Sequence, residues 1–432
     1  MALRENQGPL SATQPKGKET QLNILLMLSL AASLALPDAY TIAGALFAVV
    51  GLYYLSKRML KRANILEPNL AGKLPLIFMA FAFICAAVQL WHRAPISHYE
   101  MYIPFLWAPL IFVAVLDGRV DRRFLWLGCL LGAIFAGCLS IYQLLHLGID
   151  RPQGFVGSRI TFSNIAILLG SVALAGRHDP PLHSRKPLWL ALAYFVSLFS
   201  LVPSLLSQSK GGWPLFLLVF IWALVEDFRR GSRSHRLPLV FVGLLFVCLM
   251  VFMPLDKNMD RIKDATTGAM QWFQTGEIVD SSVGPRLELL KFGIAIWLEK
   301  PLLGHGRDGI VAKMYEFTGE NKINPKMLEM GLIFLHNEPV QLLAEQGIVG
   351  FLSWGMMISA SFIVFSHAYL QRNHVQKKLG RAGLMAVLAA LIFGSTDMNL
   401  MLNAYRQTFV LLIMVITALL VGARKREKLR GS

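Results

Sequence analysis

Long apolar runs are the feature that most constrains how this chain can fold. A helix needs about 20 apolar residues to cross a lipid bilayer, and runs of about that length recur about twelve times in the sequence. They lie near residues 22–37, 40–56, 74–91, 99–116, 124–147, 160–176, 187–206, 212–226, 237–254, 347–368, 382–397 and 403–422. Hydrophobic residues make up 55% of the chain and charged residues 16%, which is too apolar for a soluble protein of 432 residues. We therefore expect an all-α integral membrane protein with about 12 transmembrane helices, nine within residues 21–254 and three within 347–422.

Lysine and arginine are divided unequally between the two sets of connections that link these runs. With the N-terminus inside, the inner segments carry 27 of the 42 basic residues, and the short outer loops hold five. Inner loops of membrane proteins carry such an excess, so both termini are expected to be cytoplasmic, residues 1–20 as a disordered tail and 423–432 as a basic tail. The basic residues are dispersed over seven inner segments, and this pattern disfavours nucleic acid as a partner.

One long outer segment, residues 255–346, has room for folded structure outside the bilayer. Its part 286–298 has apolar residues at helical spacing and is followed by Pro301, which predicts an amphipathic helix lying on the bundle or on the bilayer surface. A second short helix is expected to begin near Asn337, because Asn is a favoured N-cap and Pro339 fits only a first helical turn. The segment therefore reads as one large outer loop that contains short helices.

Three cations on the outer side are candidates for an anion site. Arg159 and Lys210 each stand where a span meets the outer surface, and Arg286 begins the predicted helix. Two glycines follow Lys210, and their small size exposes backbone N–H groups of the kind that bind phosphate. Two alternative roles stay open for these residues, because such cations also snorkel to lipid headgroups and small residues also pack helices together. Arg93, Arg151 and Arg406 fit interface anchoring better, and Arg406 is the strongest site candidate of these three.

His336 stands between an apolar run, 331–335, and the expected helix start at Asn337. The other histidines lie mostly in polar loops. A helix N-terminus carries about half a positive charge, which favours a neutral imidazole able to act as a base and an anionic ligand close by. A histidine that merely caps or bridges backbone groups would suit the same position equally well.

Metal chemistry and nucleophilic catalysis by a triad have little support. The outer segments contain no Asp-x-Asp pair, no His-Glu-x-x-His spacing and no nucleophile-elbow motif. His305 and Asp308 look like polar residues of a turn. The four cysteines, Cys85, Cys129, Cys138 and Cys248, all fall inside predicted spans and behave as small hydrophobes. We expect no cofactor and no metal.

Three motifs in the central and C-terminal half resemble those of the O-antigen ligase and O-antigen polymerase superfamily, which are polytopic glycosyltransferases of the GT-C type in the bacterial inner membrane. They are Ser207-x-Ser209-Lys210-Gly211-Gly212-Trp213; Gly284-Pro285-Arg286 with Trp297 and Pro301-Leu302-Leu303-Gly304-His305-Gly306; and, as the most specific, His336-Asn337-x-x-x-Gln341-Leu342-Leu343-x-Glu345-x-Gly347-x-x-Gly350. Lys210 stands where the family more often has Arg, so the charge is kept and a bidentate fork is lost.

The resemblance implies a donor, an acceptor and residue roles. The donor is O-antigen polysaccharide on undecaprenyl diphosphate, and the acceptor is a sugar hydroxyl of lipid A core on the periplasmic side. His336 is then the general base, and Arg286, Lys210 and Arg159 bind the diphosphate. Supporting residues are expected among Asn337, Glu338, Gln341 and Arg406.

One large outer loop before the tenth span resembles the ligase, because polymerases of the superfamily usually have two. A polymerase with the same donor chemistry remains the alternative. A transporter for lipid-linked oligosaccharide fits less well, because its ionisable residues would lie near the bilayer midplane.

Overall fold

The computed structural model describes residues 16–61, 68–180, 186–229, 243, 255–276, 283–329 and 334–431. Within these ranges the regular secondary structure is entirely helical, which confirms the predicted all-α class. The N-terminal half contains α1 (Lys16–Ala32), α2 (Ala39–Leu60), α3 (Leu70–Trp91), η1 (Ile96–Tyr102), α4 (Ile103–Leu106), α5 (Ala108–Asp117), α6 (Arg122–Leu145), α7 (Arg159–Ala175), α8 (Lys186–Phe199), α9 (Val202–Leu206) and α10 (Trp213–Arg229). The C-terminal half contains α12 (Leu255–Thr275), α13 (Gly284–Glu299), α14 (Gly306–Gly319), α15 (Lys326–Glu329), α16 (Glu338–Tyr369), α17 (His374–Gly394), η2 (Asn399–Met401) and α18 (Asn403–Gly431).

Seven helical segments in the described ranges are long and apolar enough to cross a membrane: 39–60, 70–91, 96–117, 122–145, 186–206, 338–369 and 403–429. Helices also occupy the predicted runs near 22–37, 160–176, 212–226 and 382–397. The predicted span 237–254, like the first fifteen residues of the tail, lies outside the described residues apart from Gly243. The chain is therefore a membrane-spanning helical protein, and the number of twelve spans stays a prediction.

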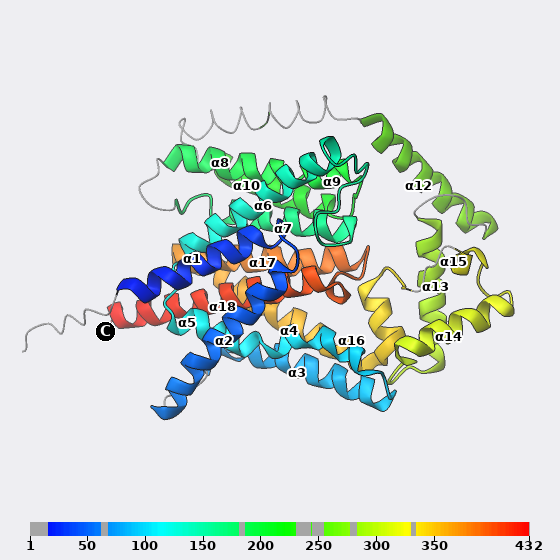
Figure 1. Cartoon of the computed structure of the whole chain (residues 1–432), viewed down its shortest axis with the longest axis horizontal. Helices are drawn as coiled ribbons and strands as arrows, with labels where there is room; N and C mark the ends of the chain where they lie inside the picture. Colours follow the sequence, from blue (N-terminus) through cyan, green and yellow to red (C-terminus); the bar gives the residue numbers. More distant parts are fainter. Residues whose placement is uncertain are drawn as a thin grey trace, which may run out of the picture.

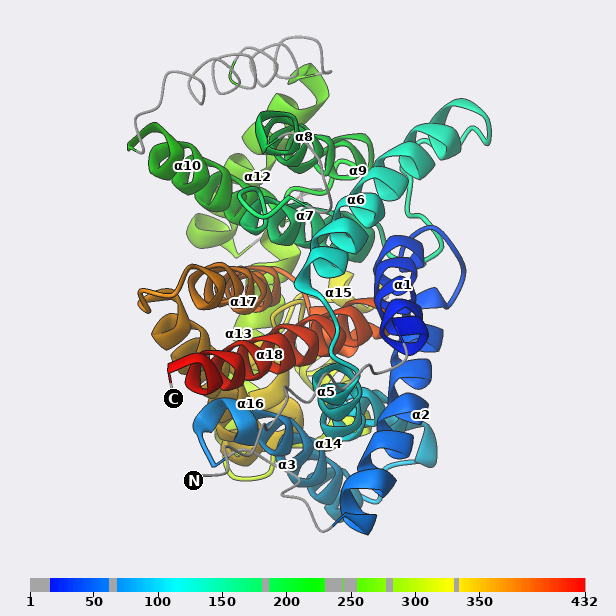
Figure 2. The same cartoon turned by 90° about the vertical axis from the view of Figure 1, so that its left-hand side faces the viewer.

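Helix α18 forms the centre of the bundle. It contacts α2, α3, α5, α7 and α17, and nearly every side chain from Tyr405 to Val421 is buried. Figure 2 shows α18 running through the middle of the molecule between α17 and α5. Peripheral helices instead expose large apolar side chains, such as Val49 and Leu52 on α2, as expected where lipid covers the surface.

Helices α12 to α15 project from one end of the bundle (Figure 1). The predicted helix over 286–298 is α13, and its buried Leu289, Phe292 and Ile296 pack in a small apolar core separate from that of the bundle. Residues of α14 and the first turns of α16 complete this core. The apolar face of α13 is therefore covered by protein.

Helix α16 is broken at Gly347, where φ is 63° and ψ is −162°. The backbone of the loop after α13 enters the break: Ile348 N donates to Pro301 O (2.8 Å) and His305 N donates to Ala344 O (2.9 Å). A Cβ at Gly347 would lie 2.3 Å from the backbone of Leu302, and one at Gly304 would lie 2.6 Å from Ala344 O. Both glycines are therefore required by the close approach of two backbones and by their positive φ.

The bundle has two ends, to which we give names. The α13 end is where residues 395–402 join α17 to α18 and where α13 begins, and the C-terminal end is where α18 finishes (Figure 1). Segments predicted to be on the inner side meet at the C-terminal end, as shown by the ion pairs Arg122–Asp179 (2.5 Å) and Arg381–Glu226 (2.5 Å). The predicted grouping of the loops is thus seen in the structure, whereas the side of the membrane that each end faces remains a prediction.

Candidate active site

Residues 207–212, between α9 and α10, form a tightly bonded loop at the α13 end. Ser209 N donates to Ser204 O (2.9 Å), and the Ser207 hydroxyl lies 2.8 Å from that of Ser163 on α7. A Cβ at Gly212 would lie 2.5 Å from Ile167 Cδ1, and one at Gly211 would lie 3.0 Å from Thr396 Oγ1. The two glycines therefore serve close packing, and they bring Lys210 against α7 and the connection between α17 and α18.

Lys210 and Arg286 line one cavity of about 490 Å³. Arg151 from the connection between α6 and α7 lines it too, and its Nε donates to Ser207 O (3.0 Å). The remaining lining residues described are Ile160, Gln208, Ser209, Gly211, Pro214, Ala265, Thr266, Ala269, Val283 and Thr396. Ser209 Oγ is buried and makes no hydrogen bond within the described part of the chain. Cationic side chains and this hydroxyl give the cavity the donors that a phosphate requires.

Arg159 is the first residue of α7 and lines a neighbouring cavity of about 560 Å³. Arg151 and Ile160 line both cavities. Arg159 is exposed and does not line the cavity of Lys210 and Arg286. It therefore lies next to the predicted anion site and not within it.

His336 is held by a carboxylate. Its Nδ1 lies 3.0 Å from Asp397 Oδ1, and the Asp397 side chain is only 7% exposed, whereas that of His336 is 26% exposed. A carboxylate at Nδ1 places the proton there and leaves Nε2 as the hydrogen-bond acceptor. His336 has a φ of 48°, a strained backbone conformation for a residue other than glycine. The residue before Asp397, Thr396, lines the cavity of Lys210 and Arg286, so the connection at 395–402 joins the histidine to the cations.

Residues after His336 fasten the start of α16 to the same connection. Asn337 is the N-cap of α16, as predicted: its Oδ1 accepts from Val340 N (3.1 Å), and its Nδ2 donates to Ser395 O (3.1 Å). Glu338 is buried and accepts from Leu400 N (2.9 Å). Since Asn337 supplies the cap, His336 is not needed for that task.

Arg406, in the first turns of α18, is buried and hydrogen-bonds to the connection at 395–402. Its Nη1 donates to Leu400 O (3.2 Å) and Met401 O (2.9 Å), and its Nη2 donates to Asn403 Oδ1 (3.3 Å). A buried guanidinium bonded to backbone carbonyls does not fit an anchor at the lipid interface. Arg406 therefore shapes the segment that presents Asp397.

Gln341 and Glu345 belong to a buried polar chain between α16 and α3. Gln341 Oε1 accepts from Leu335 N (3.2 Å), and its Nε2 donates to Glu345 Oε2 (2.9 Å). Gln89 on α3 donates to the other oxygen of Glu345 (2.6 Å). The backbone of Leu335, just before His336, is thereby tied to the bundle.

The predicted turn at 304–309 is wrong for residues 306–309, which begin α14, and His305 is more than polar decoration. It is buried, and its Nε2 donates to Ile296 O (2.8 Å), while the Asp308 side chain is 76% exposed. Burial lowers the pKa of His305 below its ordinary value of 6.5. Among the described residues, no three His, Cys, Asp or Glu side chains are grouped so that they could hold a metal ion.

Sequence reasoning missed Asp397 and underrated Arg151. Asp397 is an acidic residue among Ser395, Thr396 and Asn399 at the outer end of a predicted span. An ionisable residue in such a place is a functional signal in its own right. Arg151 gave a weaker sequence signal, because a single cation near an interface is more simply understood as a lipid anchor.

Taken together, these observations describe a polytopic membrane protein with a cavity lined by cations, beside a histidine–carboxylate pair, at one end of its helices. Residues 195–355 match the family model described as O-antigen ligase, and all three sequence motifs lie within this range. This match supports membership of the O-antigen ligase and polymerase superfamily. It is also 21% identical over 403 residues to an uncharacterized protein of Haemophilus influenzae, covering 90% of this chain and 96% of that relative.

Proposed function

We propose that the protein is an O-antigen ligase, which transfers O-antigen polysaccharide from undecaprenyl diphosphate to a sugar hydroxyl of lipid A core. One observation carries this proposal: Lys210 and Arg286, 76 positions apart, line a single cavity whose wall includes Thr396, next to the carboxylate that holds His336. The cationic cavity suits a diphosphate, and the neighbouring histidine suits a nucleophilic hydroxyl.

The reaction is an inverting displacement at the anomeric carbon of the donor sugar. The acceptor oxygen attacks this carbon while the bond to the diphosphate oxygen breaks, and the hydroxyl proton passes to Nε2 of His336. General-base help of this kind is worth roughly 10²–10⁴-fold in rate. Asp397 fixes the tautomer of His336 and stabilises the imidazolium that forms.

The leaving group is a stable anion, so its departure requires fixed positive charge and no general acid. Arg286 and Lys210 supply this charge where the negative charge grows, with Arg151 in the same wall and Arg159 at the neighbouring cavity. Because these cations neutralise the diphosphate, the transfer is proposed to need no divalent metal.

The chain is proposed to lie in the bacterial inner membrane with the α13 end in the periplasm and both termini in the cytoplasm. The charge distribution supports this orientation, since 27 of 42 basic residues lie in the predicted inner segments. Reporter fusions after Lys61, Arg122 and Lys378 should report the cytoplasm, and fusions within 260–330 should report the periplasm. A cytoplasmic reading within 260–330 would overturn the site assignment.

The deciding experiment uses the purified chain with lipid-linked O-antigen and lipid A core, with and without excess EDTA. A product on lipid A core supports the ligase, whereas a lengthened lipid-linked polymer without transfer to core would make the protein a polymerase. Activity in EDTA should stay within about a factor of two, an allowance for changes in electrostatic screening. A strict requirement for restored Mg²⁺ would contradict the role given to the cations.

A further inference from the structure

A second cationic cavity lies at the C-terminal end, about 930 Å³ in volume and opposite the proposed active site. Helix α18 reaches from one to the other: Asn403 begins it at the α13 end, and its residues 418–429 line this cavity. At a rise of about 1.5 Å per residue, the separation is close to the ~30 Å thickness of the hydrocarbon core. The cavity therefore opens at the level of the lipid headgroups on the other side of the bilayer.

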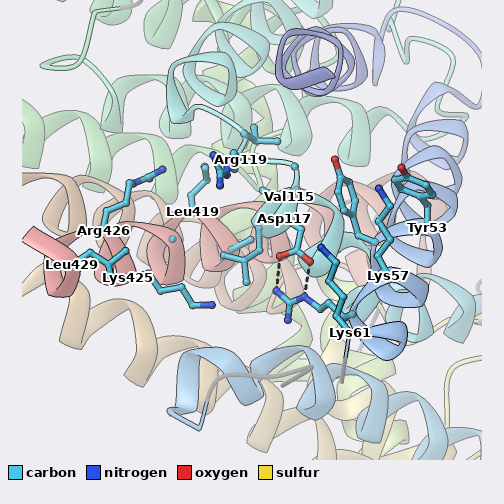
Figure 3. A pocket seen from close by; sticks show the side chains of 17 residues that line it. Tyr53, Lys57, Lys61, Val115, Asp117, Arg119, Leu419, Lys425, Arg426 and Leu429 are labelled. Carbon is cyan, nitrogen blue, oxygen red and sulfur yellow. Dashed lines mark hydrogen bonds and ion pairs between the residues drawn. The ribbon is translucent and has the colours of Figure 1, made fainter. Parts of the chain in front are cut away.

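Six cations line this cavity: Lys57, Arg58, Lys61, Arg119, Lys425 and Arg426. Figure 3 shows Lys57 and Lys61 on one side, Lys425 and Arg426 on the other, and Asp117 between them. Asp117 is the one acidic residue among the lining residues, and it forms a bidentate ion pair with Arg58, with both N···O distances at 2.5 Å. The lining therefore keeps a large excess of positive charge after this pair is counted.

The floor of the cavity is apolar. Val115 and Leu116 from α5 and Ala418 and Leu419 from α18 line it beneath the cations. A small soluble anion makes no use of such a floor, whereas a glycerophospholipid presents a phosphate together with its glycerol and the beginning of its acyl chains. A rim of Lys and Arg above an apolar floor between membrane helices meets the physical requirements of a lipid-headgroup site.

We propose that this cavity binds the phosphate headgroup of an anionic glycerophospholipid, with phosphatidylglycerol as the test ligand. An excess of cations at this end serves membrane orientation by itself, but orientation requires neither a hollow nor an apolar floor. The site is separate from sugar transfer, so its test does not depend on the proposed ligase activity.

The first experiment changes charge. The full chain in nanodiscs of neutral lipid is titrated with fluorescent phosphatidylglycerol. The test protein is the double variant Lys57→Gln with Lys425→Gln. The control is the double variant Arg372→Gln with Lys377→Gln, which changes two cations near the same end that do not line the cavity. Binding should weaken on the order of tenfold in the first double variant and less than twofold in the second. Equal losses in both would show that diffuse surface charge, and not the cavity, attracts the lipid, and would overturn the proposal.

The second experiment changes shape and leaves every charge in place. A Cβ at Gly422 would meet only ordinary contacts, 3.7 Å from Leu116 Cδ1 and 3.9 Å from Arg426 Nη2, so Gly422→Ala should bind like the parent protein. Gly422→Leu extends into the cavity and should weaken binding at least fivefold. Unchanged binding in Gly422→Leu would show that the lipid lies elsewhere.

Competition identifies the chemical source of the phosphate. Zwitterionic phosphatidylcholine and inorganic phosphate, each at the concentration at which phosphatidylglycerol saturates, should displace little of the probe. Displacement by inorganic phosphate would show that the cavity binds a soluble anion, and displacement by phosphatidylcholine would show that it does not select for charge. Either result contradicts the proposal.

Discussion

The two ends of the bundle treat their carboxylates differently. At the C-terminal end, carboxylates pair with guanidinium groups: Arg177 bonds Asp227 (2.8 Å) and Glu226 (2.7 Å), and both Arg177 and Asp227 side chains are fully buried. At the α13 end, the two buried carboxylates beside residues 395–402 pair with a backbone N–H or an imidazole: Glu338 with Leu400 N and Asp397 with His336. Arg286 has no carboxylate within ion-pair distance among the described residues.

This difference separates charge used for structure from charge reserved for a ligand. A buried ion pair locks the helices that carry its members and is costly to break. When the carboxylates near a cation in a cavity have other partners, the positive charge is not neutralised and can attract an incoming anion. Neutralising the ion-paired Arg177 should therefore affect stability, and neutralising Arg286 should affect catalysis.

The largest effect is expected at Arg286. Arg286→Ala removes a donor to the growing negative charge and should lower ligation on the order of 10²–10³-fold with a normal protein level. Arg286→Lys should recover only part, because the guanidinium fork is lost. The control is Lys291→Ala, an exposed cation on the same helix. Wild-type rates in both Arg286→Ala and Lys210→Ala would place the diphosphate elsewhere.

His336 comes next. His336→Ala should lower turnover by about 10²-fold while donor binding and thermal stability are retained, and Asp397→Asn should lower turnover less. The matched control is His374→Ala, an exposed histidine. A folded, fully active His336→Ala protein would remove the base from the mechanism.

Breaking the ion pairs at the C-terminal end should give the reverse pattern. Arg177→Met leaves Asp227 buried without its guanidinium partner, which costs roughly 3–5 kcal/mol of stability. Lys322→Met, which breaks an exposed pair with Glu320, should leave the melting temperature nearly unchanged. Thermal unfolding in detergent measures both. If Arg177→Met unfolds like the parent protein yet loses turnover, the comparison between the two ends fails.

The smallest effect concerns acid stability through His305. Burial lowers the pKa of His305 in the folded protein, so the unfolded chain binds a proton more readily. This contribution to stability is fully present above pH ~6.5 and is lost as the pH falls from there through the folded-state pKa. His305→Gln, which cannot take up the proton, should show a smaller drop in melting temperature between pH 7.5 and pH 5, by a few degrees. An identical drop in both proteins would assign the acid sensitivity to other groups.

Most of the fold follows from the sequence, because apolar length and turn residues act locally. The runs, the helix at 286–298 and the N-cap at Asn337 are all properties of neighbouring residues. Lys210, Arg286 and His336 could be proposed from the sequence because cations and a histidine are conspicuous in predicted outer segments. Asp397 was not found, since its role arises from a contact with His336 across 61 positions, created only by the packing of α16 on the α17–α18 connection.

The break in α16 has a consequence for how this protein can vary. The loop at 301–305 is held in the break by main-chain atoms, from Pro301 O to Ile348 N and from His305 N to Ala344 O. Such a joint places no demand on the side chains of Leu302 and Leu303, but it excludes any Cβ at Gly304 and Gly347. Substitutions at the exposed Leu302 should therefore be tolerated, while the two glycines fix the angle at which the α12–α15 helices stand on the membrane bundle.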